Sequence, residues 1–302
     1  MKVFITGGTG FVGSAVVQEL VANGFETSAQ KLISWGAQPV RGSLTSLSTL
    51  ATAAAQADAI IHLGFNNDFR HFFQAGAMDR RAIETMGRAI SGTNKPLVVT
   101  YGTTGIRKHV ETEHEVADTG LLKWLTPRKS EIVARQLMAQ NINAFVVRLS
   151  PAVHGAGDKG FTRTVIERAK KSHRAEYFGL GTHAWSAVHR LDAAHLFYLV
   201  TMYGLEHPTT NERVFNAVAE ESITTAAIAR TISRKLNVPL KAKYNPLSFG
   251  DTAMLYLINC PTSSQLTQQI LGWVPVQPDL LTDMVDCKIN PNAVRTKKIS
   301  FL

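Results

Sequence analysis

The chain has 302 residues, of which 45% are hydrophobic and 18% charged, as in a soluble globular protein of one large or two moderate domains. No apolar run approaches the roughly 20 residues of a membrane-spanning helix, and no secretory leader pattern is visible, so we expect a cytoplasmic protein with no membrane contact. The two cysteines, Cys260 and Cys287, lack metal-ligand spacing, which predicts a reduced compartment and no metal. The net charge of +9 is scattered, so we expect attraction for an anionic cofactor rather than nucleic-acid binding.

The first element is a strand, a glycine-rich turn and a helix in direct succession. Residues 1–6 are predicted to form a buried strand, and residues 14–23 a helix with one apolar face. Between them, Gly7, Gly10 and Gly13 have the spacing Gly-x-x-Gly-x-x-Gly. Gly7 permits a tight turn, Gly10 a close approach to a pyrophosphate, and Gly13 close packing of helix on strand. This arrangement predicts a bound nucleotide, because the helix N-terminus attracts phosphate.

The stretch after this helix is too short for the next strand of a doubly wound sheet. Residues 28–35 are predicted to be helical and residues 38–41 to form a short strand, so only residues 25–27 remain for a strand that needs ~5–6 residues. Either the sheet is short at this point, or a segment between Thr27 and Ser28 is missing from the sequence, which we favour. The Cα–Cα distance between these two residues would decide, because consecutive Cα atoms lie ~3.8 Å apart.

The following residues alternate between apolar strands and helices. The apolar runs are continuous rather than alternating, which is typical of a parallel sheet covered on both faces. The predicted strands are residues 59–63, 96–101 and 144–149, and the predicted helices are residues 44–57, 67–90 and 128–140.

Beyond Pro151 the pattern changes to helices separated by short strand-like pieces. The predicted helices are residues 161–172, 191–203 and 224–236, and the strand-like pieces are residues 175–178 and 214–217. The sequence therefore predicts a doubly wound (Rossmann) α/β domain over residues 1–150. Residues 151–302 are expected to form mainly a smaller α+β substrate lobe, with segments that return to the first domain.

These motifs together resemble the extended and atypical short-chain dehydrogenase/reductases, the NAD-dependent epimerase/dehydratase-like family. The matching stretches are residues 6–13, 57–63, 146–155, 187–194 and 271–273. The resemblance implies a nicotinamide dinucleotide cofactor. Similar family members carry an arginine just where this chain is short, and such an arginine accepts the ribose 2′-phosphate. We therefore expect NADP, with NAD as the alternative. The resemblance also implies a homodimer through residues 67–90 and 128–140.

In this family a tyrosine and a lysine four residues later carry the proton chemistry, but no tyrosine of this chain has a lysine at that spacing. The aligned positions hold Pro127 and Glu131. Proline has no side-chain proton to transfer and glutamate reverses the charge, so the usual mechanism cannot operate from these positions.

Other residues are therefore candidates for the catalytic role, each with a structural alternative. Tyr101 follows the 96–101 strand and points either into the pocket or into the core. Thr103 either orients substrate or bonds backbone in a glycine- and threonine-rich turn. His154 lies after the 144–149 strand, where this fold places ligands, and is equally well explained as a structural histidine. Arg128 is a further candidate near the Pro127 position.

Several further residues have a mainly structural interpretation. His62 is expected in the core near the cofactor, and His189 and Asp192 at a helix entry. An aromatic group either walls a substrate pocket or packs a helix on the sheet. It comprises Phe65, Phe69, Phe72 and Phe73.

The cofactor-binding residues are expected from the glycine turn and from the family alignment. Ser43 replaces an acidic residue near the adenine, which predicts a weakened contact. The full expected set is Gly7, Thr9, Gly10, Phe11, Val12, Gly13, Ser43, Leu44, Leu63, Gly64, Phe65, Thr100, Tyr101, Ser150, Pro151 and Val153.

We expect an NADP(H)-dependent oxidoreductase that reduces a small, fairly apolar carbonyl or imine. A hydride transfer needs one proton donor near the developing charge, and positioning by the cofactor supplies much of the rest. Two alternatives remain open, because fold alone does not fix function. One is a non-redox isomerase, cyclase or dehydratase that uses the same pocket. The other is a nucleotide-binding sensor without turnover.

Overall fold

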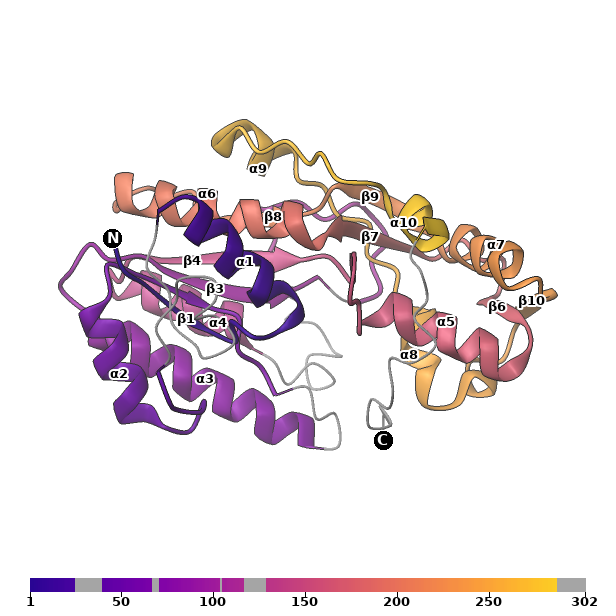
Figure 1. Cartoon of the computed structure of the whole chain (residues 1–302), viewed down its shortest axis with the longest axis horizontal. Coiled ribbons are helices and arrows are strands. Elements are labelled where there is room, and N and C mark those ends of the chain that lie inside the picture. Colours follow the sequence, from indigo (N-terminus) through magenta and orange to yellow (C-terminus); the bar gives the residue numbers. More distant parts are fainter. Residues whose placement is uncertain (25–39, 67–70, 104, 117–128, 287–302) are drawn as a thin grey trace.

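The computed structural model describes residues 1–24, 40–66, 71–103, 105–116 and 129–286, whose arrangement is shown in Figure 1. Within these residues, five parallel strands form one sheet in the spatial order β1-β2-β3-β4-β8. They are β1 (Val3–Thr6), β2 (Ala59–His62), β3 (Leu97–Gly102), β4 (Ala144–Leu149) and β8 (Val214–Ala217). Most of their residues are buried, as the continuous apolar runs predict.

Helices cover both faces of this sheet (Figure 1). One face packs against α1 (Phe11–Ala22) and α6 (Arg190–Glu206). The other packs against α2 (Leu47–Gln56), α3 (Phe72–Ala89) and α4 (Ser130–Ala139). The predicted α/β fold with helices on both faces of a parallel sheet is therefore confirmed.

The second half of the chain builds two smaller sheets. The three-stranded sheet has the order β5-β7-β9, with β5 (Ala152–His154), β7 (Ala184–His189) and β9 (Glu220–Thr224). The two-stranded sheet pairs β6 (Ala175–Phe178) with β10 (Leu240–Lys243). Their helices are α5 (Phe161–Ser172), α7 (Thr225–Leu236), the 3-10 helix η3 (Pro246–Thr252), α8 (Ala253–Leu257), α9 (Gln265–Leu271) and α10 (Leu280–Asp286). None of the described helices has the length and apolar character to cross a bilayer.

Two elements assigned by the sequence to the smaller lobe lie instead in the large sheet layer. The 214–217 strand pairs with β4, and the helix predicted over 191–203 packs its apolar residues against α1 (Figure 1). Every residue of β8 is buried, which suits a strand covered on both faces and not the edge of a small sheet. β8 and α6, from the second half of the chain, thus complete the large sheet layer that the first half begins.

Helix α2 corresponds to the helix predicted over residues 44–57 but begins later, at Leu47 instead of Leu44. The hydroxyl of Ser46 accepts the backbone N–H of Ser43 at 3.1 Å, and the hydroxyls of Ser43 and Thr45 lie 2.8 Å apart. These local hydrogen bonds compete with helical ones and hold the segment in a turn. The missing second strand and the Thr27–Ser28 test fall outside the described residues.

Asp192, predicted at a helix entry, anchors the C-terminal segment to α6. It lies in the first turn of that helix and is 4% exposed. Its two carboxylate oxygens accept the backbone N–H groups of Val276 at 3.0 Å and Gln277 at 3.1 Å. Its backbone carbonyl accepts the indole N–H of Trp273. The predicted structural role is therefore confirmed.

We expect Asp192→Ala to lower the free energy of unfolding by about 1–3 kcal/mol, because two backbone donors lose a buried acceptor. Urea titration followed by circular dichroism measures this loss. Asp58→Ala is the matched control, since Asp58 also accepts a backbone N–H, that of Lys2, but in an exposed position. Its expected loss is below about 1 kcal/mol. Equal losses in both variants would contradict the anchoring role.

Candidate functional site

The glycine turn joins β1 to α1 at the carboxyl edge of the large sheet. Gly7 has a φ of +73°, a left-handed conformation that favours glycine. A Cβ atom at this position would lie 2.7 Å from the backbone nitrogen of Gly64. The turn therefore packs backbone against backbone on the residues that follow β2, and no side chain fits between them.

Gly13 holds the first turn of α1 on the glycine turn. A Cβ atom at Gly13 would lie 2.1 Å from the carbonyl oxygen of Gly7. The helix begins at Phe11, and its N-cap residue Gly10 offers no side chain to the free N–H groups of the first turn. These N–H groups and the helix dipole attract an anion, and Thr9 and Gly10 are exposed at the same place. The geometry fits the pyrophosphate of a dinucleotide.

A buried chain of polar side chains begins directly beneath this turn. The Thr6 hydroxyl accepts the backbone N–H of Gly64 at 3.1 Å, so its own hydrogen is free to reach His62 Nδ1, which lies 2.7 Å away. On the other side of the ring, His62 Nε2 lies 3.1 Å from Asp79 Oδ1. The Ser130 hydroxyl donates to Asp79 Oδ2 at 2.5 Å. This series of hydrogen bonds connects the glycine turn with the first residue of α4.

All four of these hydrogen-bonded residues are buried, and His62, Asp79 and Ser130 are 0% exposed. His62 is thus confirmed as a core residue. The sequence prediction missed Asp79, although a signal was present. Asp79 is a lone carboxylate among the buried helical positions Ala75, Ala82 and Ile83 of α3.

Glu131, which by sequence aligns with the lysine of the resembling family, forms a buried ion pair. Its carboxylate accepts Nε and Nη2 of Arg148 at 2.8 and 2.7 Å, and Nε of Arg135 at 2.9 Å. Burial opposes ionisation, but the hydrogen bonds and charges of Arg148 and Arg135 outweigh it and lower the pKa of Glu131 below 4.5. Glu131 is therefore a permanently charged partner and not a proton donor at neutral pH.

Arg148 is fixed by further contacts in addition to Glu131. It donates to the backbone carbonyls of Thr112, at 3.1 Å, and Glu115. Burial lowers the pKa of Arg148, but the hydrogen bonds and charge of Glu131 outweigh it, so that the net effect is a raised pKa. Arg148 was not singled out from the sequence, although a lone arginine inside a buried strand indicates a buried carboxylate partner.

Tyr101 lies beside this arginine on the neighbouring strand. The two residues are register partners in the β3–β4 pair. Tyr101 is half-buried, and the electrostatic interaction between its phenol and the Arg148 guanidinium contributes to the raised pKa of that guanidinium. The structure thus places a phenol next to a fixed cation at the carboxyl edge of the sheet.

Two other candidate hydroxyls at this edge bond to backbone. Thr103 is 4% exposed, and its hydroxyl donates to the carbonyl of Leu149 at 3.2 Å. Ser150 is also 4% exposed, and its hydroxyl donates to the carbonyl of Ala217 at 2.8 Å. The geometry favours the structural interpretation of Thr103 over a role in substrate orientation.

His154 lies inside the three-stranded sheet and is 1% exposed. Its Nδ1 lies 3.0 Å from Asp283 Oδ2 of α10, and its ring centroid lies 5.3 Å from that of His189. Burial, followed by the charge of His154, lowers the pKa of His189, whose Nδ1 accepts the backbone N–H of Leu191 as the cap of α6. These contacts favour the structural interpretation of both histidines.

The remaining predicted cofactor residues differ in their surroundings. Leu44 lies next to Gly64, since a Cβ atom on that glycine would be 3.2 Å from the Leu44 side chain. Ser43 is exposed in the turn before α2. The other predicted cofactor residues are the half-buried Phe11, Val12, Leu63, Phe65, Pro151 and Val153 and the buried Thr100.

The aromatic group and Arg128 are only partly described. Phe73 is 67% exposed, so it neither packs α3 on the sheet nor walls a buried pocket. Of the two interpretations of the aromatic group, packing of a helix on the sheet is therefore wrong for Phe73. Arg128, Pro127, Phe69 and the side chain of Phe72 lie outside the described residues.

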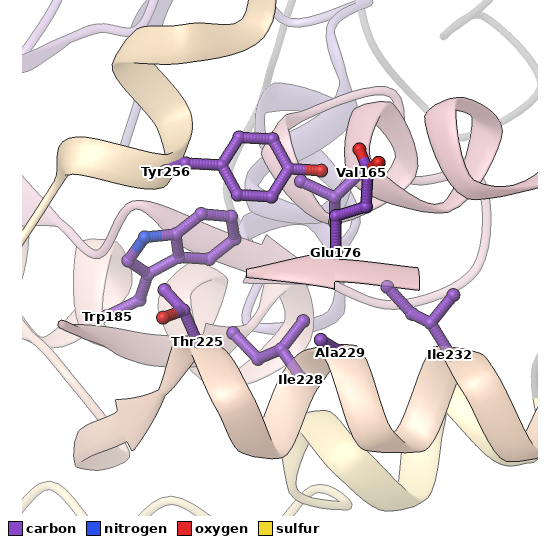
Figure 2. A pocket seen from close by; sticks show the side chains of 8 residues that line it. All are labelled: Val165, Glu176, Trp185, Thr225, Ile228, Ala229, Ile232 and Tyr256. Carbon is purple, nitrogen blue, oxygen red and sulfur yellow. The ribbon is translucent and has the colours of Figure 1, made fainter. Parts of the chain in front are cut away.

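A cavity between the smaller sheets is too small to bind a substrate. It has a volume of about 10 Å³, which is room for at most roughly one water molecule. Figure 2 shows the rings of Trp185 and Tyr256 facing Ile228 and Ala229 of α7 across it. The full lining is Val165, Glu176, Trp185, Thr225, Ile228, Ala229, Ile232 and Tyr256. Its mainly apolar lining makes it a packing defect of the core.

Comparison with known proteins points in the same direction as the glycine turn. The model of the NAD dependent epimerase/dehydratase family matches residues 3–90. An uncharacterized protein of Schizosaccharomyces pombe is 36% identical over 296 residues, which cover 94% of this chain and 98% of the relative. An uncharacterized protein of Saccharomyces cerevisiae is 39% identical over 302 residues, with the same two coverages of 94% and 98%.

Solved structures show the same fold at lower identity. The UDP-glucose-4-epimerase of Stenotrophomonas maltophila, solved with bound NAD and formylated UDP-arabinopyranose, superposes with a TM-score of 0.70. It is 17% identical, and the match covers 94% of this chain and 96% of that structure. At this identity the likeness extends to the fold and not to the reaction.

We expect Glu131→Gln to lower the free energy of unfolding at neutral pH by about 3–5 kcal/mol, because Arg148 becomes a buried charge without its anion. Glu84→Gln is the matched control, since Glu84 pairs with Arg88 in an exposed i,i+4 pair. Its expected loss is below about 1 kcal/mol. Urea titration of both variants measures the difference.

The same variant carries a pH signature of defined sign. The pKa of Glu131 is lowered by folding, so its contribution is complete above the unfolded value of 4.5 and is lost as pH falls through the folded value. The stability difference between wild type and Glu131→Gln should therefore shrink below about pH 4.5. A difference that stays constant or grows under acid would contradict the buried ion pair.

Proposed function

The chain belongs to the NAD-dependent epimerase/dehydratase family of extended short-chain dehydrogenase/reductases, and we propose that it is an NADP(H)-dependent reductase without the usual Tyr/Lys pair. Its substrate would be a small, fairly apolar carbonyl or imine. The observation that carries this proposal is the glycine turn, where Gly7 and Gly13 leave the backbone bare at the N-terminus of α1.

The cofactor would be held along the carboxyl edge of the large sheet. The N–H groups at the start of α1 would bind its pyrophosphate, Leu44 and Gly64 would border its adenosine half, and Pro151 and Val153 its nicotinamide half. When bound, the cofactor supplies the hydride that the protein itself lacks. NADP is proposed over NAD because of the resemblance to relatives with a 2′-phosphate arginine, at a position outside the described residues.

Tyr101 is the proton donor that the described geometry supports best. A cation beside a phenol favours the phenolate and so eases donation of the proton to a developing oxyanion or amide anion. In the family this cation is a lysine; here Arg148 on the adjacent strand would take that place, with Glu131 offsetting part of its charge. Tyr101 and Arg148 would thus divide the donor and cation roles between two strands.

Nucleotide binding without turnover is the alternative that one observation favours. The hydroxyls of Thr103 and Ser150 and the ring of His154 are all engaged by other protein groups. A site whose polar groups are already satisfied has few left for chemistry. In that case the protein would bind the cofactor but convert no substrate.

We expect the purified protein to oxidise NADPH in the presence of at least one member of a panel of small apolar aldehydes, ketones and cyclic imines. With that substrate, NADPH should be oxidised faster than NADH. Deuterium from C4-labelled NADPH should appear in the product, as mass spectrometry would show. Binding of NADPH without transfer of deuterium to any member of the panel would contradict the reductase and favour the sensor.

With a substrate in hand, Tyr101→Phe should lower kcat by about 100-fold or more, with a much smaller change in KM, because a general acid is removed from the transition state. Tyr244→Phe is the control, since Tyr244 is 73% exposed and lies beyond β10 in the small two-stranded sheet. Retention of wild-type kcat by Tyr101→Phe would assign proton donation to another group.

A further inference from the structure

Arg190 is the first residue of α6 and lies where the small three-stranded sheet meets the large one. It follows β7 directly, while α6 itself packs against α1 on the large sheet (Figure 1). Its Nη1 donates to the carbonyl of Ala156 at 2.8 Å, and its Nη2 to the hydroxyl of Ser14 at 3.4 Å. The guanidinium carbon lies 5.1 Å from the centre of the Phe11 ring. Arg190 is thus fixed against the first turn of α1.

The charge of this guanidinium has no carboxylate partner in the described part of the chain. The ion pairs found there connect other arginines, lysines and histidines to carboxylates, and none includes Arg190. The side chain is half-buried, and burial lowers the pKa of Arg190. Its two hydrogen bonds use two of the five N–H donors of a guanidinium, so others remain available.

This cation lies beside a second positive feature. Phe11 and Ser14 belong to the first turn of α1, whose free N–H groups and helix dipole carry a partial positive charge. A partly desolvated cation next to the positive end of a helix is unfavourable unless an anion binds to both. The glycine turn presents such an anion site at the same helix end.

We propose that Arg190 is a further cofactor-binding residue, donating to a phosphate oxygen of the dinucleotide held on the glycine turn. This inference rests on the cofactor part of the proposed function. Because Arg190 also holds the carbonyl of Ala156, the segment after β5 would be fixed to the same charge. A residue from the second half of the chain would then complete a site that the first thirteen residues begin.

A purely structural role for Arg190 predicts a different outcome and can be separated by experiment. We expect Arg190→Gln to weaken NADPH binding by about ten- to a hundredfold, since one charge-assisted hydrogen bond to phosphate is lost. Arg190→Lys, which keeps the charge but not the fork geometry, should fall between wild type and Arg190→Gln. Titration of each protein with NADPH, followed by nicotinamide fluorescence at several NaCl concentrations, measures the dissociation constants.

Arg213→Gln is the matched control for removal of a guanidinium. Arg213 is also partly desolvated, with its pKa lowered by burial, and stacks at 5.1 Å on the ring of Phe145. It precedes β8, at the opposite edge of the sheet from the glycine turn. We expect its NADPH affinity to stay within about twofold of wild type, because three strands separate β8 from β1 and salt screens charges at such a separation.

The salt dependence decides between the two roles. If Arg190 contacts phosphate, the affinity of Arg190→Gln should fall less steeply with NaCl than that of wild type, because one cation–phosphate contact is gone. Unchanged NADPH affinity in Arg190→Gln would overturn the inference. So would equal weakening in Arg190→Lys and Arg190→Gln with the salt dependence of wild type. Failure of the reductase would show instead as NADPH binding without deuterium transfer, which leaves this test intact.

Discussion

The close approach of backbone at Gly7 and Gly13 is the constraint on which the rest of the structure depends. The positions where their Cβ atoms would lie are 2.7 Å from Gly64 and 2.1 Å from the carbonyl of Gly7. Only bare backbone permits this contact, and the contact aims the N-terminus of α1 along the carboxyl edge of the sheet. The positive helix end, the polar chain beneath Thr6 and the guanidinium of Arg190 all meet at this turn. A side chain at either glycine would separate these groups.

The polar groups of the site divide into those that hold the scaffold and those left for chemistry. Glu131 and Arg148 neutralise each other in the core, and Asp79 binds His62 and Ser130 across three elements. These groups are buried and hydrogen-bonded, as buried polar groups must be to avoid a large desolvation penalty. Glu131, the predicted counterpart of the family's lysine, thus serves the structure as the partner of Arg148.

The sequence predicted the strand, turn and helix of the nucleotide site because glycine spacing and apolar runs are local patterns. It also predicted four strands of the large sheet within one or two residues at each end, since strands buried on both faces need no distant partner to be recognised. The site contacts were different. Arg148 is 17 residues from Glu131, His62 is 17 from Asp79, and Arg190 is 176 from Ser14. Such pairs are set by how strands and helices pack, and a single sequence does not show that packing. The same limit misplaced β8 in the smaller lobe, because its four residues are equally compatible with either sheet.

Titration of wild type and Gly13→Ala with NADPH tests the central claim most directly. The account predicts one NADPH per wild-type chain. It also predicts affinity weakened by about tenfold or more in Gly13→Ala, because the added methyl must displace either the turn or the start of α1. Circular dichroism of both proteins would verify that the variant is folded. Equal affinity in a folded Gly13→Ala, or no saturable binding of NADPH or NADH to wild type, would contradict the nucleotide site.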